Sequence, residues 1–268
     1  MVTAVSVVRD WNLYNRCLRE NLYCKDWNFH VFDNNDDNKP IPERYNSFLD
    51  EYDYDKESWF VFCHEDFEPL ESIDGKIHCL DRGALYGPIG CKRVGFAGFG
   101  VQRFYGQVSV CRRDSDKITG AVGVAVDEIA GVETFDCCCL ILHSSLVKKY
   151  NLRFDRKLYF DLYVEDFCAS AKVRCGINSF ILPFRACHHS NSVPTERLRR
   201  HLPYLRQKYP NDFFVGTCTY FGTFSIQKKI QDWIVDKIKR FVQKSANFES
   251  RGKSISSILA ILAVFYRK

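Results

Sequence analysis

Three side chains that could bind a metal, His64, Glu65 and Asp66, follow directly after a run of aromatic and β-branched residues. The run, 59–63, predicts a strand that is buried on both faces. Ligands of open α/β sheets bind beyond the carboxyl ends of the strands, and these side chains fall at that position. Two carboxylates and an imidazole there could hold a divalent cation. A polar loop that caps a strand is the simpler interpretation of an isolated triplet, so other parts of the chain have to decide.

Two further groups of this kind occur later in the chain. Glu165 and Asp166 precede a predicted helix over 167–173, whose positive dipole end stabilises carboxylates. His188 and His189 follow a predicted strand, and they could bind a metal or be ordinary hydrogen-bonded residues. Each group alone has a simple structural explanation.

Strands and helices alternate along the first part of the chain. Hydrophobic periodicity predicts strands at 2–8, 29–32 and 59–63 and helices at 12–22 and 40–54. The order β-α-β-α-β implies parallel strands with right-handed crossovers, so we expect an α/β fold with a mainly parallel central sheet flanked by helices. Asp33 ends the second strand in a polar turn, where an acid suits recognition of a ribose or a base.

The middle of the chain is less regular. Glycine-dense stretches at 86–90 and 94–100 suit strands and tight turns, and neither matches a phosphate-binding loop. Further strands are predicted at 122–130 and 132–142, before a short helix at 144–150. No internal repeat or low-complexity linker separates these elements.

The number and spacing of the cysteines indicate whether the protein resides in a reducing or an oxidising cell compartment. The chain of 268 residues holds thirteen cysteines, without a Cys-x-x-Cys spacing and without a cleavable signal before the first strand. A chain of this length can bury a large core without disulfides, so we expect reduced cysteines in a cytoplasmic protein. Cys137, Cys138 and Cys139 are consecutive, and a strand would point them to alternating faces, so we expect core residues rather than zinc ligands.

The net charge of +5 is unevenly distributed. From residue 225 onward ten Lys or Arg stand against three acids, a net +7, which leaves −2 for the rest of the chain. A neutral-to-acidic body argues against nucleic-acid binding, and a basic tail argues for contact with an anionic surface. The charge therefore separates the body of the chain from a basic C-terminal tail.

The tail predicts an amphipathic helix from Ile226 to Lys244, with an apolar face opposite a lysine-rich one. This pattern is typical of a helix in a membrane interface; docking on the body or on a second subunit is the alternative. The apolar segment 255–266 has about twelve residues, too few to span a bilayer, which needs about twenty. We expect peripheral attachment to the inner face of a membrane.

Taken together, the order and spacing of these motifs resemble family 2 glycosyltransferases of the A-type fold, called GT-A. The resemblance is closest to the branch named after a streptomycin-biosynthesis protein, where His-x-Asp replaces the more usual Asp-x-Asp. It covers about residues 1–215 and leaves the tail out, which implies a catalytic domain over 1–215 and a basic helical tail over 216–268. No single motif is specific, and the ones that carry the resemblance are Asp33, Tyr45-Asn46, Phe62 to Asp66, Ile89-Gly90, Gly95 to Gly98, Phe135-Asp136, Glu165-Asp166 and His188 to Ser190.

The resemblance implies a donor site with a metal ion. Asp33 would contact the uracil or the ribose of the nucleotide. Asp66, together with His64, would bind the Mn²⁺ or Mg²⁺ ion that bridges the diphosphate. His188 would be a further metal ligand, with His189 as the less favoured substitute.

The resemblance also implies roles for the later acids. Asp136 would lie near the donor sugar or the acceptor, and Asp166 would be the general base, with Glu165 as its alternate. A carboxylate that accepts the proton of the acceptor hydroxyl fits direct displacement with inversion. A divalent cation neutralises the charge that develops on the diphosphate leaving group.

We therefore expect an inverting glycosyltransferase of polysaccharide biosynthesis. It would move a sugar from a nucleotide-sugar donor, a UDP-sugar being favoured, to a hydroxyl of a glycan or a lipid-linked acceptor. A metal-dependent nucleotidyltransferase or hydrolase on a similar sheet is one alternative, because a fold does not determine a function. A catalytically inert module that binds sugar nucleotides is another.

Overall fold

The structure, a computed structural model, describes residues 1–94, 101–113, 117–190 and 196–223. The predicted amphipathic helix, the apolar segment 255–266 and the Gly95 to Gly98 motif lie outside these residues and stay predictions. Within the described part, no helix has both the length and the apolar character needed to cross a membrane.

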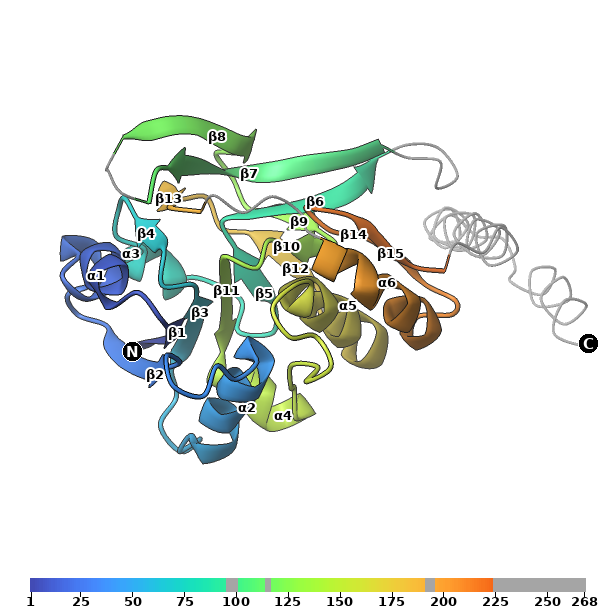
Figure 1. Cartoon of the computed structure of the whole chain (residues 1–268), viewed down its shortest axis with the longest axis horizontal. Helices are drawn as coiled ribbons and strands as arrows, with labels where there is room; N and C mark the ends of the chain where they lie inside the picture. Colours follow the sequence, from blue (N-terminus) through green and yellow to red (C-terminus); the bar gives the residue numbers. More distant parts are fainter. Residues whose placement is uncertain (95–100, 114–116, 191–195, 224–268) are drawn as a thin grey trace, which may run out of the picture. The chain divides into compact units, whose positions relative to one another are not determined.

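A central sheet of seven strands organises the described chain (Figure 1). In spatial order its strands are β2 (Asn28–Asp33), β1 (Val2–Val8), β3 (Trp59–Cys63), β11 (Cys139–His143), β5 (Leu85–Gly87), β12 (Ser179–Ile181) and β9 (Ala130–Val132). Helices pack on both faces of this sheet, so the predicted α/β class is confirmed.

The central sheet is mixed, where we expected a mainly parallel one. The pairs β1–β2, β1–β3 and β5–β12 are parallel, and the other three pairs are antiparallel. The reversal begins at β11, whose first residue, Cys139, lies opposite Cys63, the last residue of β3. No helical crossover leads into β11, because the chain reaches it from a second sheet. The end of β3 and the start of β11 therefore share one edge of the sheet.

Alternation along β3 supplies both layers of the core. Phe60 and Phe62 pack into the larger cluster, with residues of helices α2, α4, α5 and α6. Val61 and Cys63 face the opposite cluster, which includes residues of α1 and α3. The predicted strand buried on both faces is confirmed, since every residue of β3 is buried.

The helix predicted at 144–150 is confirmed at these bounds, and the other helices differ in length from the predictions. Their bounds are α1 (Trp11–Tyr14), α2 (Ile41–Glu51), α3 (Asp74–Ile77), α4 (Ser144–Tyr150), α5 (Tyr163–Cys175) and α6 (Glu196–Lys208), with a π-helical turn at Asn15–Arg19 and a 3₁₀ turn at Leu22–Cys24. Helix α5 starts four residues earlier than predicted, after Leu162 with φ of 64°. Its first turn therefore contains Glu165 and Asp166.

A second sheet carries the other half of the candidate site. In spatial order its strands are β10 (Thr134–Phe135), β6 (Ile89–Val94), β7 (Val101–Cys111), β13 (Ala186–His188) and β4 (Phe67–Pro69), with β8 (Ile118–Val124) paired to β7. A separate hairpin joins β14 (Phe213–Val215) to β15 (Tyr220–Gly222). The single strand predicted over 132–142 is two strands, β10 and β11, and Asp136 lies in the turn between them.

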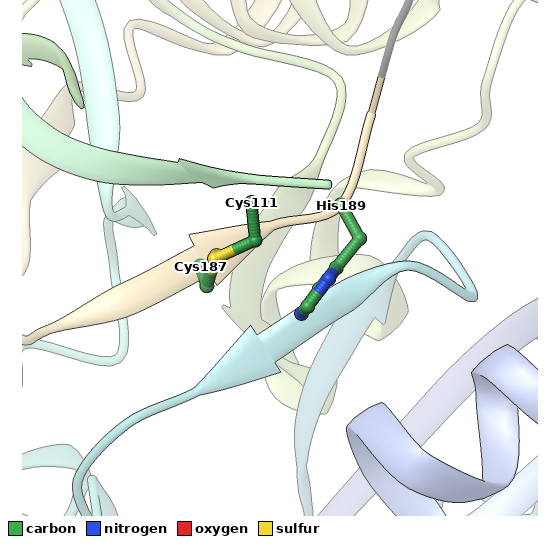
Figure 2. A group of neighbouring side chains, drawn as sticks. All are labelled: Cys111, Cys187 and His189. Carbon is green, nitrogen blue, oxygen red and sulfur yellow. A yellow bond between two sulfur atoms is a disulfide. The ribbon is translucent and has the colours of Figure 1, made fainter. Parts of the chain in front are cut away.

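A disulfide joins β7 to β13 through Cys111 and Cys187, whose Cα atoms are 6.2 Å apart (Figure 2). This differs from the reduced cysteines that we expected. The pair is 76 residues apart in sequence, so only the parallel pairing of β7 with β13 brings it together. The other eleven cysteines are free thiols, and Cys138 and Cys139 are buried as predicted.

Candidate functional site

His64, Asp66 and His188 come together where the two sheets meet. One potential ligand atom from each residue lies within 4.8 Å of the other two. His188 Nε2 is 3.2 Å from Asp66 Oδ1, and His64 Nδ1 is 3.9 Å from the same oxygen. The antiparallel pairing of β13 with β4 produces this arrangement, because it sets His188 opposite Phe67, next to Asp66.

Asp66 and His188 form an ion pair that overcomes the cost of burial. Burial by itself raises the pKa of Asp66 and lowers that of His188. The facing charges act in the opposite direction and prevail, so the pKa of Asp66 lies well below its usual range and that of His188 above its usual value. The pairing therefore favours an imidazolium facing a carboxylate.

The hydrogen bonding of this pair is incomplete. Asp66 Oδ1 and His188 Nε2 are buried, and neither atom has a hydrogen-bond partner within the described chain. The two atoms face each other at 3.2 Å as an ion pair, so each is satisfied only in part and has no other hydrogen-bond partner in the described chain. A divalent cation would satisfy both atoms once it displaced the His188 proton, and oxygen and imidazole nitrogen are ligands that Mn²⁺ accepts. The residues present thus fit a metal ion.

Tyr163 determines which nitrogen of His64 is free. The Tyr163 hydroxyl donates to the carbonyl of Cys137 at 3.1 Å, so its oxygen accepts the proton of His64 Nε2 at 2.8 Å. Burial is the main cause that lowers the pKa of His64, which favours the neutral ring. The lone pair then resides on Nδ1, the nitrogen on the Asp66 side.

A pocket of about 710 Å³ opens beside His64 and Asp66, and both side chains line it. The aromatic residues Tyr159 and Phe160 line it too, and the ring of Phe160 stacks on His64 with centroids 5.8 Å apart. Pockets for small ligands usually measure about 300–1,000 Å³, so a nucleotide-sized molecule fits.

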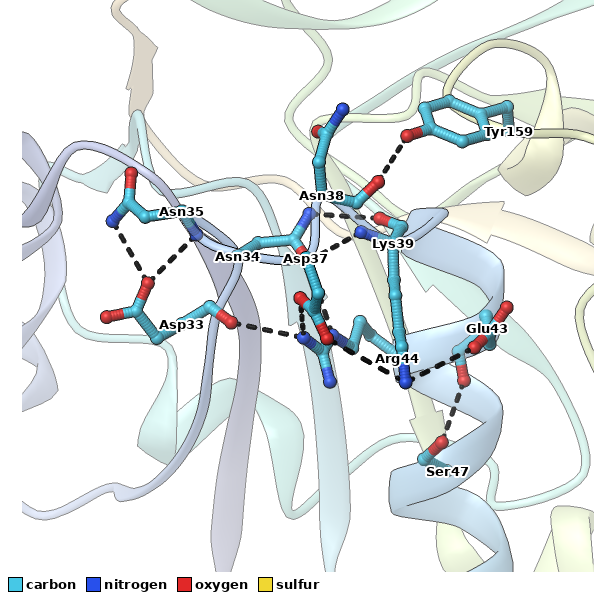
Figure 3. Close-up of polar contacts among 10 residues, drawn as sticks. All are labelled: Asp33, Asn34, Asn35, Asp37, Asn38, Lys39, Glu43, Arg44, Ser47 and Tyr159. Atoms are coloured by element: carbon cyan, nitrogen blue, oxygen red, sulfur yellow. Dashed lines mark hydrogen bonds and ion pairs between the residues drawn. The ribbon is translucent and has the colours of Figure 1, made fainter.

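The loop after β2 forms another wall of the pocket (Figure 3). The Asn34 side chain closes the loop on itself, because its amide donates to the carbonyl of Lys39 and accepts from the Lys39 N–H. Arg44 Nη2 donates to the carbonyl of Asp33 and to the Asp37 carboxylate. Tyr159 bonds the Asn38 carbonyl from the opposite side. The asparagines of this wall are thus held in fixed positions.

Asp33 stands beside this wall and outside the lining of the pocket. Its carboxylate accepts two hydrogen bonds from Asn35 at 3.0 Å and one from Trp11 Nε1 at 3.1 Å. The backbone N–H of Asn35 is the main cause that lowers the pKa of Asp33. Asp33 is therefore an ionised acceptor at the end of β2.

Asp136 connects the metal-ligand group with the later acids. Its oxygens accept from the Cys138 N–H at 3.0 Å and from Thr217 Oγ1 at 2.8 Å. Asp136, Cys138 and His188 form a second group with potential ligand atoms within 4.8 Å. The charge of Asp136 also raises the pKa of Glu165, so the two carboxylates are neighbours.

Glu165 is 2% exposed, and burial with the charge of Asp136 raises its pKa to about 8. Its carboxylate accepts from the Cys137 thiol at 3.0 Å. The turn between β14 and β15 covers it: a Cβ on Gly216 would lie 3.0 Å from the Glu165 Cγ. A proton is therefore held on Glu165 at neutral pH.

Asp166 has a different environment. It is 1% exposed, accepts from Tyr209 Oη and Lys208 Nζ at 2.7 Å each, and does not line the pocket. Lys208 also binds Asp155 at 2.6 Å. Burial raises the pKa of Asp166 in spite of the opposing lysine charge. The sequence analysis missed Lys208 and Tyr209, because no local pattern links helix α6 to these acids.

His189 points away from the Asp66 carboxylate. Strand alternation puts it on the same face as Cys187, near the disulfide (Figure 2). Its Nε2 lies 2.7 Å from Glu68, its Nδ1 lies 3.1 Å from the carbonyl of Arg112, and its pKa is raised to about 10. With a pKa of about 10 the ring is charged at neutral pH and both nitrogens carry protons, which leaves no lone pair for a metal.

Comparisons with known proteins give structural similarity only. No protein-family model matches the chain, and no curated protein matches its sequence. A structure of GalNAc-T7 with UDP, GalNAc and Mn²⁺ is similar over 79% of this chain, with 8% identity and a TM-score of 0.48. This chain spans about half, 49%, of the length of that one.

Two smaller proteins are also similar in structure. A197 from STIV matches over 84% of this chain and 95% of its own, with 11% identity and a TM-score of 0.37. A glycosyltransferase involved in the glycosylation of the major capsid of PBCV-1 matches over 74% and 97%, with 10% identity and a TM-score of 0.36. Similarity at this level says nothing about activity, which has to follow from the side chains.

Proposed function

We propose that the chain is a metal-dependent glycosyltransferase of the GT-A type that uses a nucleotide-sugar donor, a UDP-sugar being favoured. One observation carries the proposal: two facing ligand atoms, Asp66 Oδ1 and His188 Nε2, are buried without hydrogen bonds beside a pocket of nucleotide size. His64 Nδ1 completes the set. When bound, Mn²⁺ or Mg²⁺ would neutralise the charge that develops on the diphosphate leaving group.

The nucleoside would lie against the loop after β2. Asp33 offers an ionised acceptor at its start, and the amides of Asn35 and Asn38 line the pocket. The donor sugar would then lie toward Asp136, whose carboxylate neighbours both His188 and Glu165.

Glu165 is the better candidate for the general base. With a pKa of about 8 it is mostly protonated at neutral pH, and the ionised fraction that can act as a base grows as the pH rises toward 8. Asp166 already accepts from Lys208 and Tyr209, so we give it the role of holding α6 against α5. The turn that contains Gly216 must yield for an acceptor hydroxyl to reach Glu165. Attack by that hydroxyl on the face of the sugar opposite the leaving diphosphate would give inversion at the anomeric carbon.

We also propose the acceptor, which would be a glycan or a lipid-linked sugar of polysaccharide biosynthesis. We propose in the same way that the catalytic domain ends at residue 215, that the protein is cytoplasmic and that its tail contacts a membrane.

A binding screen tests the donor and the metal. UDP, GDP, dTDP and CMP are titrated by calorimetry with and without Mn²⁺ into the wild type, Asp66→Asn and the control Asp53→Asn, which removes an exposed charge. We expect one nucleotide to bind with metal dependence that only Asp66→Asn abolishes. Binding of none of them would overturn the proposal. Release of phosphate from the matching nucleotide sugar, without sugar transfer, would favour a hydrolase.

A further inference from the structure

Three cationic side chains, Arg9, Lys39 and Arg113, line the pocket beside Asp66. Lys39 is shared between Asp37 and Glu43, each at 3.7 Å. The Arg9 guanidinium has no ion pair with any residue of the described chain. The lining also holds the acids Asp10, Glu65 and Asp66, so the feature that indicates an anionic ligand is the arginine N–H donors that face the pocket rather than a net positive charge.

Glu65 fixes the position of the Arg113 guanidinium. One oxygen of Glu65 accepts the backbone N–H groups of Arg9 and Asp10, at 2.6 and 2.9 Å. The other accepts from Arg113 Nη2 at 2.6 Å. The Glu65 side chain is only 13% exposed, so this carboxylate is anchored between the end of β1 and the end of β7.

Most of the donor capacity of Arg113 is unused. A guanidinium has five N–H donors, and the Glu65 contact occupies one of them. The side chain stays 46% exposed and lines the pocket. Arginine binds phosphate oxygens through two parallel hydrogen bonds, which a fixed guanidinium makes at lower entropic cost.

We propose that Arg113, held by Glu65, and Arg9 bind the phosphate groups of the pocket's ligand. The inference rests on the proposed function for the identity of that ligand, a nucleoside diphosphate linked to a sugar. Arg113 follows β7 in the connection to β8, so this connection would take part in donor binding. The sequence alone does not predict this role, because Arg113 lies 48 residues from Glu65.

Pyrophosphate without metal is the probe that isolates this site. Its binding to the full chain is measured by calorimetry in EDTA, for the wild type, Arg113→Met and the control Arg112→Met. Arg112 is the neighbouring exposed arginine, and it does not line the pocket. We expect Arg113→Met to weaken pyrophosphate about tenfold, as for loss of a charge-assisted hydrogen bond, and Arg112→Met to change it less than about twofold. Equal thermal midpoints of the two variants exclude a folding defect.

Two comparisons distinguish failure of the Arg113 inference from failure of the proposed function. Equal affinity of wild type and Arg113→Met for pyrophosphate, or binding to neither, overturns the role of Arg113. UDP and uridine are then titrated under the same conditions. UDP binding no more tightly than pyrophosphate, while pyrophosphate still depends on Arg113, would overturn the UDP-sugar site and leave the phosphate site standing.

Discussion

Asp66 and Asp166 are both buried carboxylates beside a cation, and the structure treats them in opposite ways. Asp66 keeps an oxygen without a hydrogen bond, its pKa is lowered, and a pocket opens next to it. Asp166 accepts from Lys208 and Tyr209, its pKa is raised, and it does not line that pocket. A buried carboxylate by itself is therefore weak support for a binding or catalytic role. A buried carboxylate with an oxygen that lacks a hydrogen bond and faces a pocket is stronger support.

Removal of the Asp66 carboxylate should have the largest effect of the changes considered, on both Mn²⁺ binding and sugar transfer. Asp66→Asn keeps the shape and loses the charge that a metal needs, so we expect Mn²⁺ binding to vanish and sugar transfer to fall by about 1,000-fold, the scale of a lost electrostatic contact in a transition state. Metal titration followed by electron paramagnetic resonance and a donor-turnover assay measure the two effects. Asp166→Asn should leave Mn²⁺ affinity within about threefold, and an equal loss in both variants would contradict the distinction.

Breaking the Asp166 group should instead cost stability. Lys208→Met leaves Asp166 and Asp155 without their cation, and uncompensated buried charge costs about 3 kcal/mol. Urea unfolding measures the loss. The double variant Lys208→Met with Asp166→Asn should recover part of it, because the deeper charge is then gone. No recovery would mean that the lysine acts through packing alone.

Glu165 should make stability depend on pH. Its pKa rises from 4.5 in the unfolded chain to about 8 in the fold, so the folded state holds the extra proton between these values. Stability should then fall as the pH rises from about 4.5 to about 8, by up to about 5 kcal/mol relative to Glu165→Gln, because each pKa unit corresponds to about 1.4 kcal/mol. Unfolding midpoints of both proteins at several pH values test this; parallel curves would show that Glu165 titrates normally.

Tyr163 should have the smallest effect, because it acts on the site through His64. Tyr163→Phe removes the oxygen that accepts from His64 Nε2, so the imidazole loses its orienting partner. Loss of such a partner typically costs about tenfold in metal affinity. Mn²⁺ titration tests this against Tyr159→Phe, a tyrosine on the pocket wall that makes no contact with His64. An unchanged affinity would remove His64 from the ligand set.

Local sequence patterns predicted the individual strands and helices better than the way these elements pair and pack. The buried strand β3 and the polar triplet after it were predictable, because alternation and composition are properties of neighbouring residues. The antiparallel entry of β11 was not, since it depends on where the second sheet returns the chain. The same holds for the site: the resemblance placed His188 with Asp66, whereas Lys208, Arg113 and the disulfide partners meet only through packing.

The ligand atoms of the candidate metal group come from two different sheets. His64 follows β3 of the central sheet, and His188 ends β13 of the second sheet. Neither sheet alone can therefore bind the ion tightly, and the three ligands exist as a group only after the sheets have docked. Formation of the group depends on contacts between distant parts of the chain, which form slowly during folding. Acquisition of metal affinity would thus mark the end of folding, and could time it in a refolding experiment.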